Sequence, residues 1–272
     1  MGQSRYQVGF IGAGKLAGSV IRGLLLKKFC APNQIIVSEP NAALRESLRD
    51  DLGIAIAQNN RELAASADLI FLGVKPQMVL PILREIGDGV EHKLVVSLAA
   101  GVRIRNIEAA TPARVMRVIT NTPSAIGCAA SALAAGSRTT NEDRGKVRTI
   151  FDAIGIAVEV DDDEIDAVTA LGGSGPAFVY VMIKALGAGG IKAGLKNEKD
   201  ALKLAAQTVS GAAELALSSN KTPEELIAMV VTPGGTTAAG LQVMEGRSTA
   251  AGISAAVEAA AARGGEMARE NQ

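Results

Sequence analysis

The feature that most constrains this chain is an apolar segment, residues 6–11, followed at once by two closely spaced glycines and a helical pattern. Continuous apolar runs of this length are typical of strands buried in a parallel sheet. Gly12 is expected to make a tight turn, and Gly14 lets the backbone approach a ligand closely. The helix that begins near Lys15 then points its first N–H groups at an anion, and Ala17 is small enough to pack on the strand. The segment predicts an α/β fold.

A second segment makes that turn a candidate dinucleotide site. Residues 34–37 form another strand pattern, which ends in Ser38 and Glu39 about twenty residues after the glycines. An acidic residue at this spacing is typical of folds in which a carboxylate binds a ribose hydroxyl. The alternative is a glycine-rich turn that binds nothing.

Composition restricts the ligand to small molecules and other subunits. The 272 residues include 28 lysines and arginines and 28 aspartates and glutamates, so the formal net charge is zero. The overall charge therefore does not indicate binding to nucleic acid or to an anionic membrane. His92 is the single histidine, which disfavours a metal site or a histidine-based triad. No signal peptide is expected before the first strand, and no apolar run is expected to reach membrane-spanning length. A cytoplasmic location is therefore expected.

Further strand patterns follow in the first half of the chain, separated by helical patterns. Several end in small or polar residues, and open α/β sheets bind ligands at the carboxyl ends of their strands. Lys75 is either a solvated charge or a group close to the cofactor, and Asn121 either caps a turn or binds. The predicted strands are residues 6–11, 34–37, 53–56, 68–74, 93–98 and 114–119, and a last hairpin-like addition to the sheet comprises residues 130–135, a helix over 141–154 and residues 157–160.

The second half changes character near residues 161–163, where strand patterns end and alanine-rich helical patterns begin. We therefore predict a dinucleotide-binding domain over residues 1–161 and an all-α domain over residues 162–272. Helices with few large side chains bury little area alone, and burial stabilises by roughly 25 cal/mol per Å². Because small residues permit close helix packing, this domain is expected to form an obligate dimer. The predicted helices are residues 165–171, 176–192, 197–217, 236–244 and 248–269, and a capping box at 222–225 begins another.

A glycine turn at residues 230–235 leads into one of these helices and is followed by the hydroxyls of Thr236 and Thr237. Free N–H groups at such a helix start can hold a carboxylate, and a threonine hydroxyl can contact an amine or imine. The alternative is a helix cap with no ligand.

These motifs, in this order, resemble the pyrroline-5-carboxylate reductases, the enzymes that make L-proline, over essentially the whole chain. The most specific matches are residues 166–177, Asp-Ala-Val-Thr-Ala-Leu-Gly-Gly-Ser-Gly-Pro-Ala, and residues 233–237, Pro-Gly-Gly-Thr-Thr. Shorter matches lie at residues 9–14, 74–76, 99–101 and 121–123.

The resemblance implies an N-terminal Rossmann domain, a helical C-terminal dimerisation domain and often a ring of five dimers. It implies hydride transfer from NAD(P)H to the C=N bond of 1-pyrroline-5-carboxylate, the last step of proline biosynthesis. Thr237 would act on the ring nitrogen as the catalytic residue, and no metal is implied. The implied substrate-binding residues are Asp162, Gly234, Gly235, Thr236 and Thr237, and the implied cofactor-binding residues are Ile11, Gly12, Ala13, Gly14, Lys15, Leu16, Ser38, Glu39, Asn60, Val74, Lys75, Pro76, Leu98, Ala99, Ala100 and Asn121.

One departure from the family concerns the cofactor. Members that favour NADPH tend to have neutral hydroxyl residues where this chain has Glu39, whose carboxylate repels a 2′-phosphate and suits the ribose of NADH. Ser38, Asn41 and Arg45 remain available to a phosphate. The prediction is therefore NADPH, with NADH as a second possibility.

Three other functions compete with this interpretation. A hydroxyacid dehydrogenase of similar build would use Lys184 as its acid, but that scheme has no place for the Pro-Gly-Gly-Thr-Thr turn. A reductase of another cyclic imine fits the same motifs. A dinucleotide-binding regulatory protein without turnover would retain the glycine turn and lose the second one, whereas here both are present.

Overall fold

The computed structural model describes residues 6–270, which divide into two compact units. The sheet unit runs up to Ser174 and includes the end of the chain from Glu258, and the helical unit spans Gly175–Val257. The division differs from the boundary expected after residue 161. Residues just beyond 161 pack on the sheet, because Ile165 and Ala170 are fully buried and Ile165 lies in one cluster with Ile119.

The sheet unit contains one eight-stranded sheet with the order β3-β2-β1-β4-β5-β6-β7-β8. All neighbouring strands are parallel except β6 and β7. The predicted addition does extend the end of the sheet, but it is not hairpin-like, because its two strands, β7 and β8, are parallel and are joined by a helix. The order reverses direction between β1 and β4, which places the topological switch point beside the glycine turn. The strands are β1 (Tyr6–Ile11), β2 (Ile35–Ser38), β3 (Ala55–Ile56), β4 (Ala67–Leu72), β5 (Leu94–Ser97), β6 (Arg114–Ile119), β7 (Ala129–Ala135) and β8 (Gly155–Glu159).

Helices cover both faces of this sheet. One core cluster joins residues of α1, α2 and α6 to the sheet, and the other joins residues of α3, α4 and α5. Phe71 on β4 stacks on Phe10 of β1 with ring centroids 4.8 Å apart, and Phe151 of α6 meets Phe71 edge-on. The helices are α1 (Lys15–Leu26), α2 (Ala42–Leu52), α3 (Asn60–Ser66), α4 (Pro76–Ile86), α5 (Ile104–Ala109) and α6 (Asn141–Ala153), with short turns η1 (Pro32–Gln34), η2 (Gly87–Val90) and η3 (Thr122–Ile126). The predicted Rossmann architecture is confirmed.

A buried charge network fastens the chain that follows the last strand. Arg117 of β6 is fully buried, and its Nη1 donates to Oδ1 of Asp162 at 2.5 Å. Arg103 donates to the Asp162 carbonyl and to the carboxylate of Asp166 at the same distance of 2.6 Å. Burial lowers the pKa of the Arg117 guanidinium, and Asp162 opposes that shift. The network holds α7 (Ile165–Val168) and the π-helical turn η4 (Thr169–Gly173) against the sheet.

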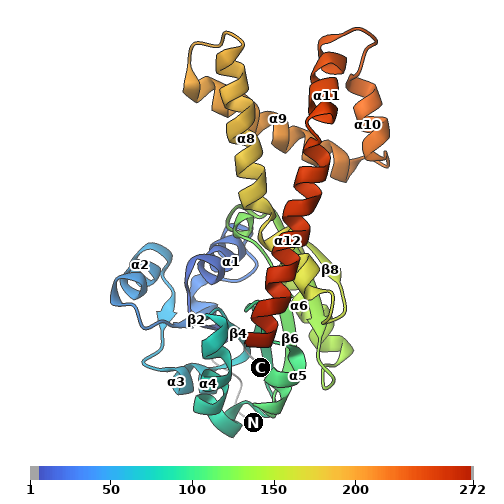
Figure 1. The fold of residues 1–272 in the computed structure, drawn as a ribbon. Helices are drawn as coiled ribbons and strands as arrows, with labels where there is room; N and C mark the ends of the chain where they lie inside the picture. Colours follow the sequence, from blue (N-terminus) through green and yellow to red (C-terminus); the bar gives the residue numbers. More distant parts are fainter. Residues whose placement is uncertain (1–5, 271–272) are drawn as a thin grey trace. The chain divides into compact units, whose positions relative to one another are not determined.

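The end of α12 (Thr249–Glu270) belongs to the sheet unit as well. Figure 1 shows this end, in red, beside α5 and β6. A Cβ on Gly101, just before α5, would lie 3.1 Å from Cβ of Met267, and a Cβ on Gly264 would lie 3.4 Å from that of Asp166. Small residues therefore permit the close approach of α12 to this part of the sheet unit.

The helical unit consists of the predicted helices and has almost no core of its own. Within residues 175–257 the buried residues are Gly187, Ala201 and Ala205, and all are small. A Cβ on Gly187 of α8 would lie 3.0 Å from a methyl of Leu202 on α9, so these two helices pack closely. Its complete helices are α8 (Gly175–Lys192), α9 (Glu198–Ser218), α10 (Pro223–Val230) and α11 (Thr236–Gly246), and α12 begins in it.

One run of helix in the described chain, residues Ile165–Lys192, is long and apolar enough to cross a membrane by length and composition. The expectation that no run reaches that length is therefore wrong. Its most apolar window has a mean hydropathy of 1.2 and is 6% buried. An exposed apolar surface of this kind also marks sites of protein–protein interaction.

Candidate cofactor and substrate site

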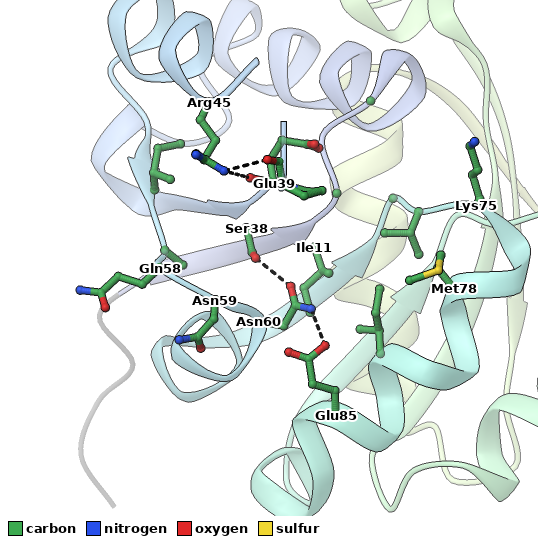
Figure 2. Close-up of a pocket in the computed structure, with 18 residues that line it drawn as sticks. Ile11, Ser38, Glu39, Arg45, Gln58, Asn59, Asn60, Lys75, Met78 and Glu85 are labelled. Carbon is green, nitrogen blue, oxygen red and sulfur yellow. Dashed lines mark hydrogen bonds between the residues drawn. The ribbon is translucent and has the colours of Figure 1, made fainter. Parts of the chain in front are cut away.

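A cleft of about 840 Å³ opens at the carboxyl ends of β1, β2 and β4, on the side of the switch point where β2 and β3 lie. Figure 2 shows Ser38, Asn60 and Glu85 meeting at its floor, with Glu39 and Arg45 on one side and Lys75 on the other. The lining comprises Ile11, Gly12, Gly14, Ser38, Glu39, Pro40, Arg45, Ile56, Ala57, Gln58, Asn59, Asn60, Gly73, Val74, Lys75, Met78, Ile82 and Glu85.

The glycine turn at the head of the cleft contains two glycines, Gly12 and Gly14, with different surroundings. Gly12 has a φ of +81°, and a Cβ there would lie 2.6 Å from a methyl of Val74 and 2.9 Å from the Gly73 carbonyl oxygen. Gly12 is therefore required by the fold itself. A Cβ on Gly14 would meet no protein atom within 4 Å, although Gly14 also lines the cleft. The open space at Gly14 lies at the start of α1, where a pyrophosphate binds in dinucleotide folds, so the residues fit such a cofactor.

Glu39, directly after β2, is held by the backbone on both of its carboxylate oxygens. Oε2 accepts from the Ala13 N–H at 2.8 Å, and Oε1 accepts from the Asn41 N–H at 3.0 Å. Arg45 on α2 donates from Nη1 to the carbonyl oxygens of Glu39 and Pro40, each at 2.9 Å. The carboxylate thus ties the glycine turn to the start of α2 and remains at the edge of the cleft.

A chain of side-chain hydrogen bonds crosses the floor of the cleft. The Ser38 hydroxyl donates to Oδ1 of Asn60 at 2.7 Å, and Nδ2 of Asn60 donates to Glu85 at 2.8 Å. This pairing fixes the Asn60 amide at the start of α3, and the resulting floor is polar and acidic.

The structure brings nine of the sixteen predicted cofactor residues to this cleft. These are Ile11, Gly12, Gly14, Ser38, Glu39, Asn60, Val74 and Lys75 in the lining, and Ala13 through its N–H bond to Glu39. The other seven do not line it: Lys15, Leu16 and Pro76 stand at helix starts, Leu98, Ala99 and Ala100 follow β5, and Asn121 follows β6. Their role toward the cofactor stays a prediction.

Two predicted side chains are already occupied by contacts within the protein. Asn121 donates to the Gly172 carbonyl at 3.0 Å and accepts from the Ala130 N–H at 3.2 Å. Asp162 accepts from Arg117 on one oxygen and from the Ile104 N–H on the other. These contacts make the Asp162 carboxylate part of the buried network, and its role toward a substrate stays a prediction.

Sequence reasoning missed several lining residues, chiefly Gln58, Asn59, Met78, Ile82 and Glu85. Three of them lie on α4, a helix between the predicted strands at residues 68–74 and 93–98 that was not itself predicted. The signal was present, because Pro76 stands at the first helical position and apolar residues recur at helical spacing after it.

The second motif lies in the helical unit, where it begins α11 as predicted. Gly234 has a φ of +70°, and the Gly235 N–H closes the turn on the Thr232 carbonyl at 2.9 Å. No side chain caps this helix start, where Thr236 is exposed and Thr237 half-buried. Uncapped N–H groups at a helix N-terminus form a site for an anion such as a carboxylate.

Comparison with known proteins relates both motifs to one family. The pyrroline-5-carboxylate reductase dimerisation family matches residues 162–267, beginning at the predicted domain boundary, and a family described as NADP oxidoreductase coenzyme F420-dependent matches residues 7–101. Pyrroline-5-carboxylate reductase of Synechocystis is 38% identical over 97% of this chain and 99% of its own length. The Arabidopsis thaliana enzyme is 39% identical over 96% of this chain and 95% of its own length.

Solved structures agree with this relationship. The pyrroline carboxylate reductase of Plasmodium falciparum, determined with NADP bound, is 28% identical and superposes with a TM-score of 0.88 over 98% of this chain and 100% of its own. A sheet with the switch point beside a glycine turn, a helical unit with almost no core and full-length relatives of one kind lead to a single assignment: this chain belongs to the pyrroline-5-carboxylate reductase family.

Proposed function

We propose that this protein reduces 1-pyrroline-5-carboxylate to L-proline with hydride from NADPH, with NADH also accepted, as the last step of proline biosynthesis. The observation that carries the proposal is the presence in one chain of an open dinucleotide cleft at Gly14 and an uncapped helix start at α11. The named relatives, which align over nearly the whole chain, support the choice of this imine.

The reaction places modest demands on the side chains. A bound reduced nicotinamide supplies the hydride, which reduces the carbon of the C=N bond, and the nitrogen gains a proton. A cyclic imine is basic enough to be protonated or hydrogen-bonded during transfer, so the protein contributes orientation more than a strong general acid. This agrees with a chain whose single histidine, His92, is not among the cleft residues.

The start of α11 is the proposed substrate site. The N–H groups that follow Gly234 and Gly235, with the Thr236 hydroxyl, would hold the substrate carboxylate, which the helix dipole also favours. The Thr237 hydroxyl would contact the ring nitrogen and keep the C=N bond in a reactive orientation. The remaining predicted cofactor residues, those after β5 and β6, would extend the cofactor site along the same sheet edge.

Initial rates of NADPH and NADH oxidation with 1-pyrroline-5-carboxylate test this assignment. In Thr237→Ala we expect kcat/KM to fall about tenfold or more, because one oriented hydrogen bond to the reacting nitrogen is lost. Thr149→Ala is the matched control, since it removes an exposed threonine hydroxyl on α6, far from the motif in sequence. Equal rates in both variants would contradict the role of Thr237. Turnover of other cyclic imines but not of this one would favour an imine reductase of different specificity, and dinucleotide binding without turnover would favour the regulatory alternative.

The helical unit is proposed to form a homodimer, and the family resemblance extends the proposal to a ring of five dimers. Exposed apolar side chains crowd this unit while its buried residues are three small ones, and monomers seldom expose large apolar patches. The same pairing would cover the apolar run of α8, which supports a subunit interface over a membrane span. Sedimentation at micromolar concentration tests this, and a monomer would refute it. The exposed apolar side chains include Tyr180, Val181, Leu186, Leu202, Leu204, Leu215, Leu217, Ile227, Met229, Val230, Val243 and Met244.

A further inference from the structure

We infer that Glu85 is a positioning residue of the cofactor cleft, because its carboxylate fixes which way the Asn60 amide faces and, through it, where the Ser38 hydroxyl points its proton. The inference rests on the proposed function in one respect: it takes a nicotinamide dinucleotide as the ligand of the cleft. It goes further by giving a function to a carboxylate that no sequence motif indicated.

The three side chains come from three different elements. Ser38 ends β2, Asn60 begins α3, and Glu85 lies in the last turn of α4. The Ser38 hydroxyl donates to Oδ1 of Asn60 at 2.7 Å, and Nδ2 of Asn60 donates to Oε2 of Glu85 at 2.8 Å. Figure 2 shows both hydrogen bonds, and all three residues line the cleft. A ligand of the cleft therefore contacts a connected chain of hydrogen bonds and not three independent side chains.

Only Glu85 gives this chain a direction. A hydroxyl both donates and accepts, and an amide has one end of each kind, so Ser38 and Asn60 alone could pair in either direction. A carboxylate only accepts, so the Asn60 amide must turn its nitrogen to Glu85 and its oxygen to Ser38. The Ser38 hydroxyl must then donate its proton to that oxygen. Without Glu85 the amide could turn over, and the hydroxyl would accept instead.

The fixed direction decides what the chain offers to a ligand. Nδ2 of Asn60 carries two N–H groups, of which Glu85 takes one, and the Ser38 oxygen keeps acceptor positions. A fixed donor beside a fixed acceptor matches a hydroxyl group, which accepts from one and donates to the other, and a dinucleotide carries such hydroxyls on its riboses. Polar groups that are oriented before binding lose less conformational freedom when the ligand arrives.

The Glu85 side chain is not needed to hold α4 in place. Nε of Arg61 donates to the backbone carbonyl of Glu85 at 2.9 Å, so the start of α3 stays tied to α4 without the carboxylate. Leu83 and Ile86 of the same helical turn are buried in the core, whereas Glu85 is exposed. A carboxylate in the last turn also lies at the negative end of the helix dipole, which destabilises the helix. The contribution of this side chain is therefore to the cleft and not to the fold.

The test compares two neutral side chains of similar length at position 85. Fluorescence titration of NADPH and NADH, without imine, gives the dissociation constants of each variant. Glu85→Met removes the acceptor, and we expect it to weaken both dinucleotides about fivefold or more, the value of one lost hydrogen bond. Glu85→Gln retains an acceptor for Asn60, and we expect it to bind within about twofold of the wild type or more tightly, because a charge that repels the anionic ligand is gone. Glu91→Met is the control, since it removes an exposed carboxylate outside the cleft lining, and it should change neither constant.

A double-mutant cycle tests whether Glu85 acts through Asn60. Adding Glu85→Met to Asn60→Ala should weaken binding no further, because the amide that Glu85 orients is already absent. Losses that multiply in the double variant overturn the inference, and so does a Glu85→Met protein that binds both dinucleotides as tightly as the wild type. If Glu85→Met unfolds, Glu85→Ala replaces it in both comparisons.

Failure of the proposed function gives a different result. Both dinucleotides would then bind, the variants at position 85 would behave as described, and 1-pyrroline-5-carboxylate would not be reduced. A wild-type protein that binds neither dinucleotide overturns both the proposed function and this inference.

Discussion

Loss of the charge on Asp162 should destabilise the sheet unit more than loss of its partner Arg117. The guanidinium is completely buried, whereas the Asp162 side chain retains 26% of its exposure. Two guanidinium nitrogens, Nε and Nη2, have no hydrogen-bond partner among the described atoms. Asp162→Asn leaves a buried cation without its counter-ion, while Arg117→Met leaves a carboxylate that water can still reach.

The expected magnitudes follow from that asymmetry. Removing one partner of a buried ion pair costs about 3–5 kcal/mol, and the partial exposure of Asp162 places Asp162→Asn near 3 kcal/mol. For a chain of this size that corresponds to a loss of about 6–12 °C in Tm. Arg117→Met should cost about 1 kcal/mol, because methionine fills most of the volume and Asp162 is rehydrated. The double variant should resemble Arg117→Met, which gives a coupling energy of about 3 kcal/mol in magnitude.

Urea denaturation at one fixed protein concentration measures all three variants, since association would shift apparent stability by mass action. A larger loss in Arg117→Met than in Asp162→Asn would refute the reasoning. The same proteins test the substrate assignment of Asp162. Both of its oxygens are used by Arg117 and Ile104, so KM for the imine should be unchanged in Asp162→Asn under conditions where it is folded.

Two further predictions concern the glycine turn and acid stability. Gly14→Ala should leave Tm unchanged and weaken NADPH binding about tenfold or more in a titration, because its Cβ meets open cleft only; Gly12→Ala should lower both Tm and affinity, since its Cβ meets Val74 in a left-handed backbone. Equal Tm losses in the two variants would contradict this division. Burial alone would raise the pKa of Asp143, but hydrogen bonds from Arg114 and Thr140 outweigh it and hold that pKa below its ordinary value of 3.8. The stability that Asp143 contributes is therefore present above that ordinary value and lost as pH falls through its lower folded-state pKa. The difference in urea midpoint between wild type and Asp143→Asn should shrink from neutral pH to about pH 3, and a difference that grows would refute the sign.

Much of the sheet unit could be predicted from the sequence because its elements have strong local signals. The run over residues 6–11 is a strand with those bounds, and the helix expected near Lys15 begins there. The strand predicted over residues 53–56 is present as the two-residue β3, and the helix α4 was not predicted, because only three residues separate it from β4. The sequence predicted a ligand site at the carboxyl ends of the strands, and the cleft lies there, since neighbouring parallel strands end at the same edge of the sheet.

Side-chain pairing within the site could not be predicted, because it depends on residues far apart in the chain. Asn60 and Glu85 are joined across 25 positions, and Arg103 and Asp166 across 63. No local pattern marks such pairs. The compact sheet unit extends past residue 161 for the same reason, since the segment after that residue is helical in sequence but is held to the sheet by Arg117 and Arg103.

The sequence assigned two carboxylates, Asp162 and Glu39, to ligand binding. They differ in the charge of their hydrogen-bond partners. Asp162 is paired with the Arg117 guanidinium, so a counter-ion lies against its charge inside the sheet unit. Glu39 is held as firmly, but by the neutral N–H groups of Ala13 and Asn41, which fix its position and leave its charge facing the cleft. Immobilisation alone therefore does not distinguish a structural carboxylate from one that selects a ligand. The partner's charge does, because only an uncompensated carboxylate can repel a phosphate and bind a ribose hydroxyl in the same place.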